Sequence, residues 1–317
     1  MINSYTRSFI CGLKGTELNK KEIYFLKKYK PWGIILFSRN IKTIKQTQNL
    51  TSSIKKIFKN NNYPILIDEE GGRVSRLKKF IDSSIFTSSY FANLYKLNKK
   101  KFNIYYDVYV KQISYLLKLL GVNINTVPVL DIKRKNQHSI IGDRAYSNKI
   151  KLISILGDIT ISKFHANRVA AVIKHIPGHG LSKVDSHLKL PVINKNYTYL
   201  KNNDFFTFKK KKALIAMTGH LLFKKIDPIN LVTHSKKLIK IIRSYVGFKG
   251  LIITDDLSMK AIKLQLETSV RKTFEAGCNI ALHCNGNIKE MEIVAKNSPR
   301  INKFIIKKTS ELMSIIS

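Results

Sequence analysis

The sequence predicts a (β/α)8 barrel, an α/β fold of eight parallel strands surrounded by helices. Short apolar runs alternate with longer stretches of helical periodicity about eight times along the 317 residues. Polar side chains follow most of these runs, which is where a barrel enzyme builds its site. A doubly wound open sheet is the main alternative, but no G-x-G-x-x-G follows the first run. We expect a single domain over residues 1–317, because no Pro-, Gly- or Ser-rich linker interrupts the chain.

The predicted strands are short, rich in Ile, Val and Leu, and continuous rather than alternating, which is typical of strands buried on both faces. They lie at residues 9–13, 32–37, 64–67, 124–132, 168–173, 213–217, 251–253 and 279–282. Apolar side chains recur with helical spacing between them. These stretches lie at residues 23–29, 44–57 and 109–120 and near 150–165, 234–246, 259–276 and 288–315.

Acids, imidazoles and amines are concentrated just after the predicted strands. They occupy the segments 38–40, 68–73, 131, 174–180, 218–220, 254–256 and 283–285. The carboxyl ends of parallel strands meet at one end of a barrel, so we expect these side chains to share a site there. Such clustering favours an enzyme, because polar residues that only cap helices or fill loops would be scattered along the chain.

The segment 174–191 predicts a loop after the fifth strand, because Gly and Pro interrupt it repeatedly. It contains His175, His179, Asp185 and His187. The 185/187 spacing lets the Asp carboxylate reach the imidazole, orient it and favour its protonated form. We expect a proton donor here. The alternatives are ordinary polar loop residues and a metal site, but the Gly-rich spacing disfavours the compact ligand geometry that metals require.

Asp255 and Asp256 directly follow the seventh predicted strand. Successive side chains of a strand face opposite ways, so one of the two should enter the barrel mouth. A carboxylate there can attack an electrophilic carbon. We expect the other to cap the next helix, since Asp is favoured at that position.

These segments together resemble the family 3 glycoside hydrolases, and within them the NagZ-type β-N-acetylglucosaminidases of bacterial peptidoglycan recycling. The resemblance extends over essentially the whole chain, and the order and spacing of the motifs match the family's. It rests on ILFSRN (35–40), DEEGGRVSRL (68–77), VPVLDI (127–132), IGDRAYS (141–147), KHIPGHG (174–180), VDSH (184–187), TDDLSM (254–259) and AGCNIALHCN (276–285). Ile176 and the segment 218–220 depart from the family's usual residues without removing an expected catalytic group.

The resemblance implies a role for each matching residue. Asp255 is the expected nucleophile, and His187, paired with Asp185, is the expected general acid and base. Residues expected to bind the sugar are Asp68, Arg76, Arg144, Lys174 and His175, with Asp131 nearby. His179 is expected to shape the turn at 178–180.

The residues alone leave simpler structural roles open for several of these side chains. Arg76 could pair with Glu69 or Glu70, and Arg144 could hold the loop after the fourth strand. Lys174 and His175 could pack the top of the barrel.

The implied activity is that of a retaining exo-β-N-acetylglucosaminidase acting on GlcNAc-1,6-anhydro-MurNAc muropeptides. The resemblance implies a cytoplasmic monomer that uses no metal or cofactor. A broader family 3 β-glycosidase and a catalytically silent glycan-binding barrel are the alternatives. The former is disfavoured by the D-S-H segment at 185–187, and the latter by the intact Asp255, Asp185 and His187.

The formal net charge of +37, from 57 Lys and Arg against 20 Asp and Glu, suggests a nucleic-acid partner when taken alone. However, the lysines are dispersed in short pairs along the chain, and no nucleic-acid recognition motif accompanies them. Lys, Asn, Ile and Tyr share AT-rich codons, so genome composition can produce the excess, and we expect no nucleic-acid or membrane partner. Steering of muropeptides, which carry peptide carboxylates, is the alternative role for the charge. A hydrophobic share of 44% excludes a disordered polycation.

The three cysteines, Cys11, Cys278 and Cys284, are few and odd in number, which suits a reducing compartment. We expect Cys278, Cys284 and His283 to pack near the eighth strand. No signal peptide and no uncharged stretch of about 20 apolar residues is visible, so we expect an intracellular protein.

Overall fold

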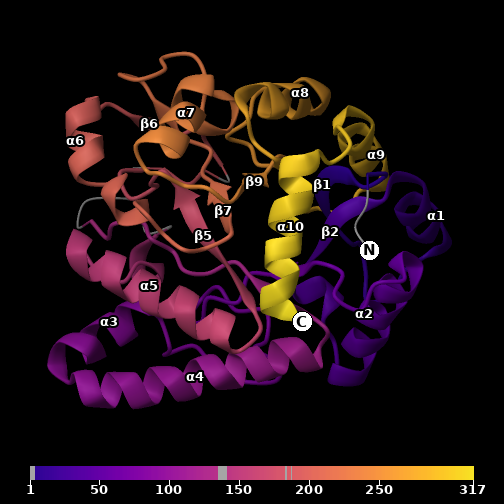
Figure 1. The fold of residues 1–317 in the computed structure, drawn as a ribbon, viewed down its shortest axis with the longest axis horizontal. Helices are drawn as coiled ribbons and strands as arrows, with labels where there is room; N and C mark the ends of the chain where they lie inside the picture. The colour runs from indigo at the N-terminus through magenta and orange to yellow at the C-terminus, as the bar shows by residue number, and fades with distance from the viewer. Residues whose placement is uncertain (1–3, 135–140, 183, 187) are drawn as a thin grey trace.

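Eight parallel strands close into a barrel in the computed structural model, which describes residues 4–134, 141–182, 184–186 and 188–317 (Figure 1). Around the barrel, the strand order is β1-β10-β9-β7-β5-β4-β3-β2. The strands are β1 (Arg7–Gly12), β2 (Pro31–Leu36), β3 (Ile65–Ile67), β4 (Ile124–Asn125), β5 (Ala170–Ile176), β7 (Ile215–Thr218), β9 (Leu251–Asp256) and β10 (Ile280–His283). The predicted barrel is confirmed, and each predicted run overlaps one of these strands.

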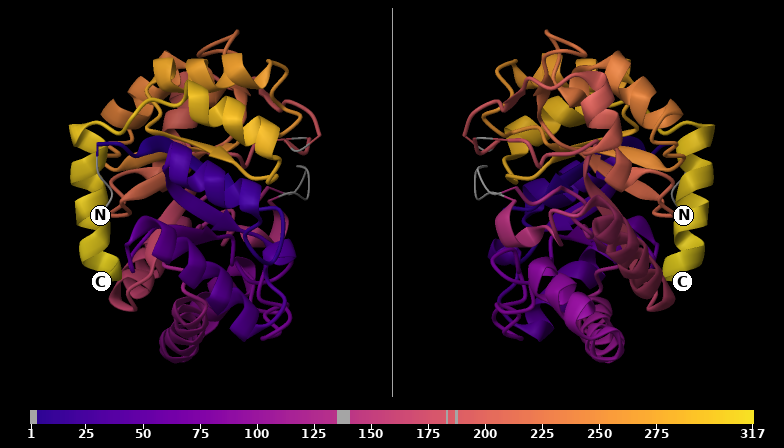
Figure 2. Two further views of the ribbon diagram at one scale, coloured as in Figure 1. Left: turned by 90° about the vertical axis from the view of Figure 1, so that its right-hand side faces the viewer. Right: turned by 90° about the vertical axis from the view of Figure 1, so that its left-hand side faces the viewer.

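Helices enclose the barrel on its outside (Figures 1 and 2). Those that the periodicity predicts are α1 (Lys20–Tyr29), α2 (Ile44–Phe58), α4 (Lys99–Leu119), α5 (Ile150–Ala166), α7 (Lys236–Ser244), α8 (Leu266–Ala276), α9 (Ile288–Asn297) and α10 (Lys303–Ile316). Two more, α3 (Ser88–Leu97) and α6 (Tyr197–Asn202), were not predicted. Two short strands, β6 (Val192–Ile193) and β8 (Leu222–Phe223), pair with each other outside the barrel. Among the described residues, no helix is both long and apolar enough to cross a bilayer.

The helix expected over 288–315 is in fact two helices. Pro299 has no N–H to donate and disfavours a helical conformation at Ser298, so α9 ends before it and α10 begins afresh at Lys303. The helix expected from residue 259 begins only at Leu266.

The strand expected over 124–132 is also shorter than predicted. Only Ile124 and Asn125 belong to β4, because the Val127 N–H turns back to the Asn125 carbonyl at 2.9 Å and Pro128 has no N–H. The chain meets β5 again at Val129, which forms an isolated parallel bridge with Lys174.

The interior of the barrel is filled with aliphatic side chains and is closed at its amino end by α10. Ile305, Leu312 and Ile316 of α10 pack in one cluster with the inward-facing strand residues. The indole N–H of Trp32, near the start of β2, donates to the Thr309 hydroxyl at 2.9 Å. Figure 1 shows α10 crossing this face of the molecule. The open end of the barrel is therefore the carboxyl end of the strands.

Leu312→Ala should lower the free energy of unfolding by about 2–5 kcal/mol, because Leu312 is fully buried and its truncation leaves a cavity under the barrel. Urea denaturation would measure the change. Leu97→Ala is a matched control, since Leu97 is 85% exposed and its truncation should change stability by less than about 0.5 kcal/mol. Equal effects of the two substitutions would contradict the role of α10 in closing the core.

Candidate active site

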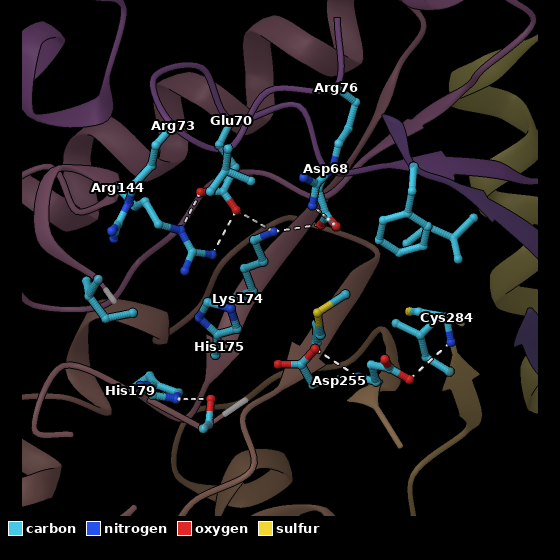
Figure 3. Close-up of a pocket in the computed structure, with 18 residues that line it drawn as sticks. Asp68, Glu70, Arg73, Arg76, Arg144, Lys174, His175, His179, Asp255 and Cys284 are labelled. Carbon is cyan, nitrogen blue, oxygen red and sulfur yellow. Dashed lines mark hydrogen bonds and ion pairs between the residues drawn. The ribbon is translucent and has the colours of Figure 1, made fainter. Parts of the chain in front are cut away.

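A cavity of about 330 Å³ opens at the carboxyl ends of the strands, as predicted (Figure 3). It is large enough for a small-molecule site. Six of the predicted residues line it together: Asp68, Arg76, Arg144, Lys174, His175 and Asp255. Further lining residues are Ile35, Phe37, Glu70, Arg73, Val74, Ile141, His179, Ser186, Met217, Asp256, Leu282 and Cys284. The structure thus brings together side chains from segments that lie far apart in the sequence.

The ammonium group of Lys174 lies between two carboxylates at the centre of this cavity. Lys174 is 2% exposed, and its Nζ lies 2.9 Å from Oδ1 of Asp68 and 2.6 Å from Oε1 of Glu70. It also donates to the Thr126 hydroxyl at 2.8 Å. Burial alone would lower the pKa of Lys174, but the two carboxylates raise it. Lys174 therefore stays charged.

Glu70 connects Lys174 to Arg144. The Arg144 guanidinium binds the Glu70 carboxylate with both Nε and Nη2, at 2.7 and 2.9 Å. Burial would raise the pKa of Glu70, but Arg144 and Lys174 lower it from 4.5 to about 2. Arg144 lies in the loop after β4 and Glu70 in the loop after β3, so this ion pair joins the two loops.

Asp68 is the second carboxylate of the network and also contacts Arg76. Arg76 Nη2 lies 3.4 Å from Asp68 Oδ2, and the Thr126 hydroxyl donates to Asp68 Oδ1. Burial would raise the pKa of Asp68, but Lys174 and Arg76 hold it below its usual range. An ionised Asp68 can accept hydrogen bonds from hydroxyl groups of a ligand.

The loop after β3 owes its shape to Glu69, whose side chain points away from the cavity. The Glu69 carboxylate accepts hydrogen bonds from the backbone N–H of Arg76 at 2.7 Å and of Leu77 at 3.0 Å. Gly71 has a φ of 79°, and a Cβ there would lie 2.3 Å from the Phe86 carbonyl oxygen, so only glycine fits. Arg76 therefore uses its backbone for Glu69 and its guanidinium for Asp68.

His175 is oriented from behind by Asp131. Its Nδ1 lies 2.7 Å from Asp131 Oδ2, and because an ionised carboxylate only accepts, Nδ1 carries the proton. Asp131 Oδ1 also accepts the His179 backbone N–H at 2.6 Å. Burial would raise the pKa of Asp131, but His175 lowers it. Asp131 lies six residues beyond the end of β4 and positions two imidazole residues rather than lining the cavity.

The loop after β5 brings Ser186 and His179 to the cavity. His179 Nε2 lies 3.1 Å from the Ser186 hydroxyl. Burial, with help from His175, lowers the pKa of His179 to about 4, so its ring is neutral near pH 7. Asp185 is half-buried next to Ser186. His187, the predicted acid, lies outside the described residues.

Asp255 and Asp256 differ in their surroundings, although both border the cavity at the end of β9. The Asp256 carboxylate accepts the Ser258 and Cys284 backbone N–H groups, each at 3.0 Å. The expectation that Asp256 caps a helix was wrong, because α8 begins ten residues later and Asp256 holds the strand end instead. Its backbone N–H donates to Asp255 Oδ1 at 2.8 Å.

The last barrel strand, β10, and the residue that follows it contribute an apolar wall to the cavity. Leu282 and Cys284 border it, and both side chains, like Cys278 and His283, are buried. Within the described ranges, no group of three or more His, Cys, Asp or Glu side chains is arranged to hold a metal ion.

Sequence reasoning placed Glu70 in a segment expected at the site without giving it a role there, and it missed Thr126. Glu70 stood next to Glu69 with no signal to distinguish the two carboxylates. Thr126 follows β4 directly in the structure, but it lay inside the strand predicted over 124–132, so the sequence offered no signal for it.

A cavity with carboxylates and cations at the carboxyl ends of the strands is the place where a barrel enzyme binds and converts a small substrate. The family model of the glycosyl hydrolase family 3 N-terminal domain matches residues 9–310. The chain is 31% identical to a beta-hexosaminidase of Nitrosomonas eutropha over 284 residues, which are 86% of this chain and 79% of that protein. It is also 31% identical to the beta-hexosaminidase of Haemophilus ducreyi over 289 residues, which are 87% and 80% of the two chains.

Two solved structures share the fold over nearly the whole chain. NagZ from Neisseria gonorrhoeae in complex with N-trifluoroacetyl-D-glucosamine matches with a TM-score of 0.84 at 25% identity, over 97% of this chain and 90% of that one. A family 3 beta-N-acetylglucosaminidase from Paenibacillus sp. has the same TM-score and identity, but this chain spans only 61% of its length. The chain therefore belongs to glycoside hydrolase family 3.

Glu70→Gln should destabilise the protein at pH 7, because Lys174 and Arg144 lose their shared anionic partner. A carboxylate whose pKa is depressed on folding stabilises the folded state above its ordinary pKa and loses that contribution as pH falls. The difference in unfolding free energy between wild type and variant should therefore shrink between about pH 4.5 and pH 2. Urea denaturation at a series of pH values would measure it.

Glu267→Gln is the matched control for this substitution. Glu267 forms an exposed ion pair with Arg271 on α8, so its loss should change stability by less than about 0.5 kcal/mol. A Glu70→Gln difference that stays constant as pH falls through this range would contradict the depressed pKa.

Proposed function

We propose that this protein is a retaining exo-β-N-acetylglucosaminidase that releases GlcNAc from GlcNAc-1,6-anhydro-MurNAc muropeptides during peptidoglycan recycling in the cytoplasm. The observation that carries the proposal is the cavity in which Asp255, on β9, faces the Asp68–Lys174–Glu70 network (Figure 3). The curated relatives are named beta-hexosaminidases, and the Neisseria relative was solved with an N-acylated glucosamine.

The sugar-binding wall follows from the charge network. Asp68 is ionised and accepts from ligand hydroxyls, while Lys174, Arg76 and Arg144 donate to ligand oxygens. In our proposal the hydroxyl groups of a terminal sugar form hydrogen bonds with these side chains. Because carboxylates and cations alternate, each hydroxyl finds both a donor and an acceptor within reach.

The first chemical step is attack by the Asp255 carboxylate on the anomeric carbon. The glycosidic C–O bond breaks, and His187 gives its proton to the departing oxygen. Retaining glycosidases generally use a second carboxylate for this transfer. Here an imidazole with an ordinary pKa of about 6.5 takes its place, and Asp185 favours its protonated form.

The second step reverses the role of His187. The neutral imidazole takes a proton from water, and the water oxygen attacks the anomeric carbon of the glycosyl-aspartate. Cleavage of the ester bond regenerates the Asp255 carboxylate and releases GlcNAc with its β configuration restored. Two inversions at one carbon account for net retention.

Asp255→Asn should reduce turnover of a chromogenic aryl β-GlcNAc by about 10⁴-fold or more, because the amide is a poor nucleophile. Steady-state kinetics would measure the loss, and circular dichroism would confirm the fold. Asp158→Asn, a partly exposed carboxylate on α5 paired with Lys211, should retain full activity. Near wild-type turnover by Asp255→Asn would refute the assignment.

His187→Ala should slow substrates with poor leaving groups by about 10²-fold or more, because these require a proton from an acid. Aryl glycosides whose phenols leave readily should be slowed much less in the same first step. Initial rates over a series of phenols of increasing pKa would show a steeper dependence than in wild type. An equal loss across the series would count against the acid role.

A substrate panel tests specificity. Aryl β-GlcNAc should be hydrolysed far faster than the matched aryl β-glucoside at equal concentration, and an anhydro-muropeptide should compete with it. Comparable rates for both glycosides would indicate a broader family 3 β-glycosidase instead.

A further inference from the structure

Both carboxylate oxygens of Asp256 accept hydrogen bonds from residues beyond the end of β9. Its Oδ1 accepts the backbone N–H groups of Ser258 and Cys284, each at 3.0 Å, and its Oδ2 accepts the Ser258 hydroxyl at 2.6 Å. The two carboxylate oxygens are therefore committed to neighbouring loops although Asp256 borders the cavity.

The backbone of Asp256 is fixed as well. His220 Nε2 lies 3.0 Å from the Asp256 carbonyl oxygen, and its Nδ1 lies 2.8 Å from the Thr233 hydroxyl. A carbonyl only accepts, so Nε2 carries a proton. Burial lowers the pKa of His220, so the neutral ring with Nδ1 as acceptor is the form present.

The Arg39 guanidinium holds the segment after β10 to which the Asp256 carboxylate binds. The Arg39 guanidinium donates to the Cys284 carbonyl and, through Nε, to the Leu13 carbonyl at 2.8 Å. Gly12 makes this approach possible, because a Cβ there would lie 2.1 Å from the Cys284 oxygen. The Cys284 peptide is thus held by Arg39 on one side and by Asp256 on the other.

One N–H group links the clamped Asp256 to Asp255. The Asp256 backbone N–H donates to Asp255 Oδ1 at 2.8 Å (Figure 3). A hydrogen bond to one oxygen restricts rotation of a carboxylate and favours its ionised form. This N–H lies in the Asp255–Asp256 peptide plane, which ends at the Asp256 Cα, and the carboxylate and carbonyl contacts hold the groups on that same Cα.

We propose that Asp256 is a positioning residue, which sets the orientation of the nucleophile Asp255 through its clamp on Ser258 and Cys284. This inference rests on the proposed function, in which Asp255 attacks the anomeric carbon. A misplacement of about 1 Å can cost about 10²-fold in rate. The clamp therefore contributes to kcat, while sugar binding stays with the Lys174 network.

A 5-fluoro GlcNAc fluoride provides the test. Asp255 attacks its anomeric carbon, the C–F bond breaks and fluoride leaves without needing an acid, so His187 does not obscure the result. The ring fluorine destabilises the oxocarbenium-like transition state of both steps, and the glycosyl-enzyme accumulates. Mass spectrometry of peptides locates the label, and the labelling rate reports nucleophile positioning.

Asp256→Ala should slow labelling of Asp255 and lower kcat by about 10²-fold, with little change in KM. Asp256→Asn should restore most of the rate, because its amide oxygen still accepts the two N–H groups and its NH₂ can donate to the Ser258 hydroxyl. Ser258→Ala keeps both backbone contacts, so it should fold even if Asp256→Ala does not, and should slow labelling to a smaller extent.

Three outcomes would overturn the inference. Labelling at the wild-type rate in both Asp256→Ala and Ser258→Ala would show that the clamp does not position Asp255. A rise in KM with unchanged kcat would show that Asp256 binds the sugar directly, and failure of Asp256→Asn to restore the rate would show that its charge acts instead. A wild-type label on a residue other than Asp255 would overturn the proposed function as well.

Discussion

The ion pairs of the buried Lys174 ammonium with Asp68 and Glu70 are the interaction on which the structure of the barrel mouth depends. A charge out of contact with water is tolerated only when it is paired, and removing one partner typically costs about 3–5 kcal/mol. Lys174 takes its partners from the segments after β3 and β4. Glu70 and Asp68 in turn recruit Arg144 and Arg76. Ion pairs and hydrogen bonds therefore join the ends of three neighbouring strands to one another.

The scarce acids of this chain are concentrated at the mouth of the barrel. Six of the 20 Asp and Glu residues, namely Asp68, Glu69, Glu70, Asp131, Asp255 and Asp256, stand at or directly beneath the barrel mouth. The cations that meet them there are a small fraction of the 57 Lys and Arg residues. Four carboxylates and four Lys or Arg side chains line the cavity, so the site is close to charge balance while the molecule as a whole is strongly basic, which fits an excess of lysine spread over the outer surface.

The sequence was sufficient to predict the barrel because each strand is a continuous apolar run and each long helix repeats with a period near 3.6. It did not predict α6, whose six residues are too few to show a period, nor the early end of β4. The site was predicted as a set of segments, since strand ends in a barrel converge. Which residues pair was not predictable, because adjacent carboxylates such as Glu69 and Glu70 look alike until the loop between them is folded.

The same limit explains the error at Asp256. An Asp after a strand and before a helical stretch suggests an N-cap, and local sequence alone cannot reveal a partner such as Cys284, which lies 28 residues further along the chain. Contacts of this kind are set by the barrel's register, which is a property of the closed sheet as a whole.

Closure of the barrel has a consequence for how the chain is made. The first strand pairs with β2 on one side and with β10 on the other, where Phe9 lies beside Ala281. During synthesis from the amino end, one edge of β1 has no partner until residues 280–283 have emerged, and the α10 helix that seals the amino end follows later still. Unpaired apolar strand edges are prone to aggregation, so the nascent chain carries this hazard through most of its translation.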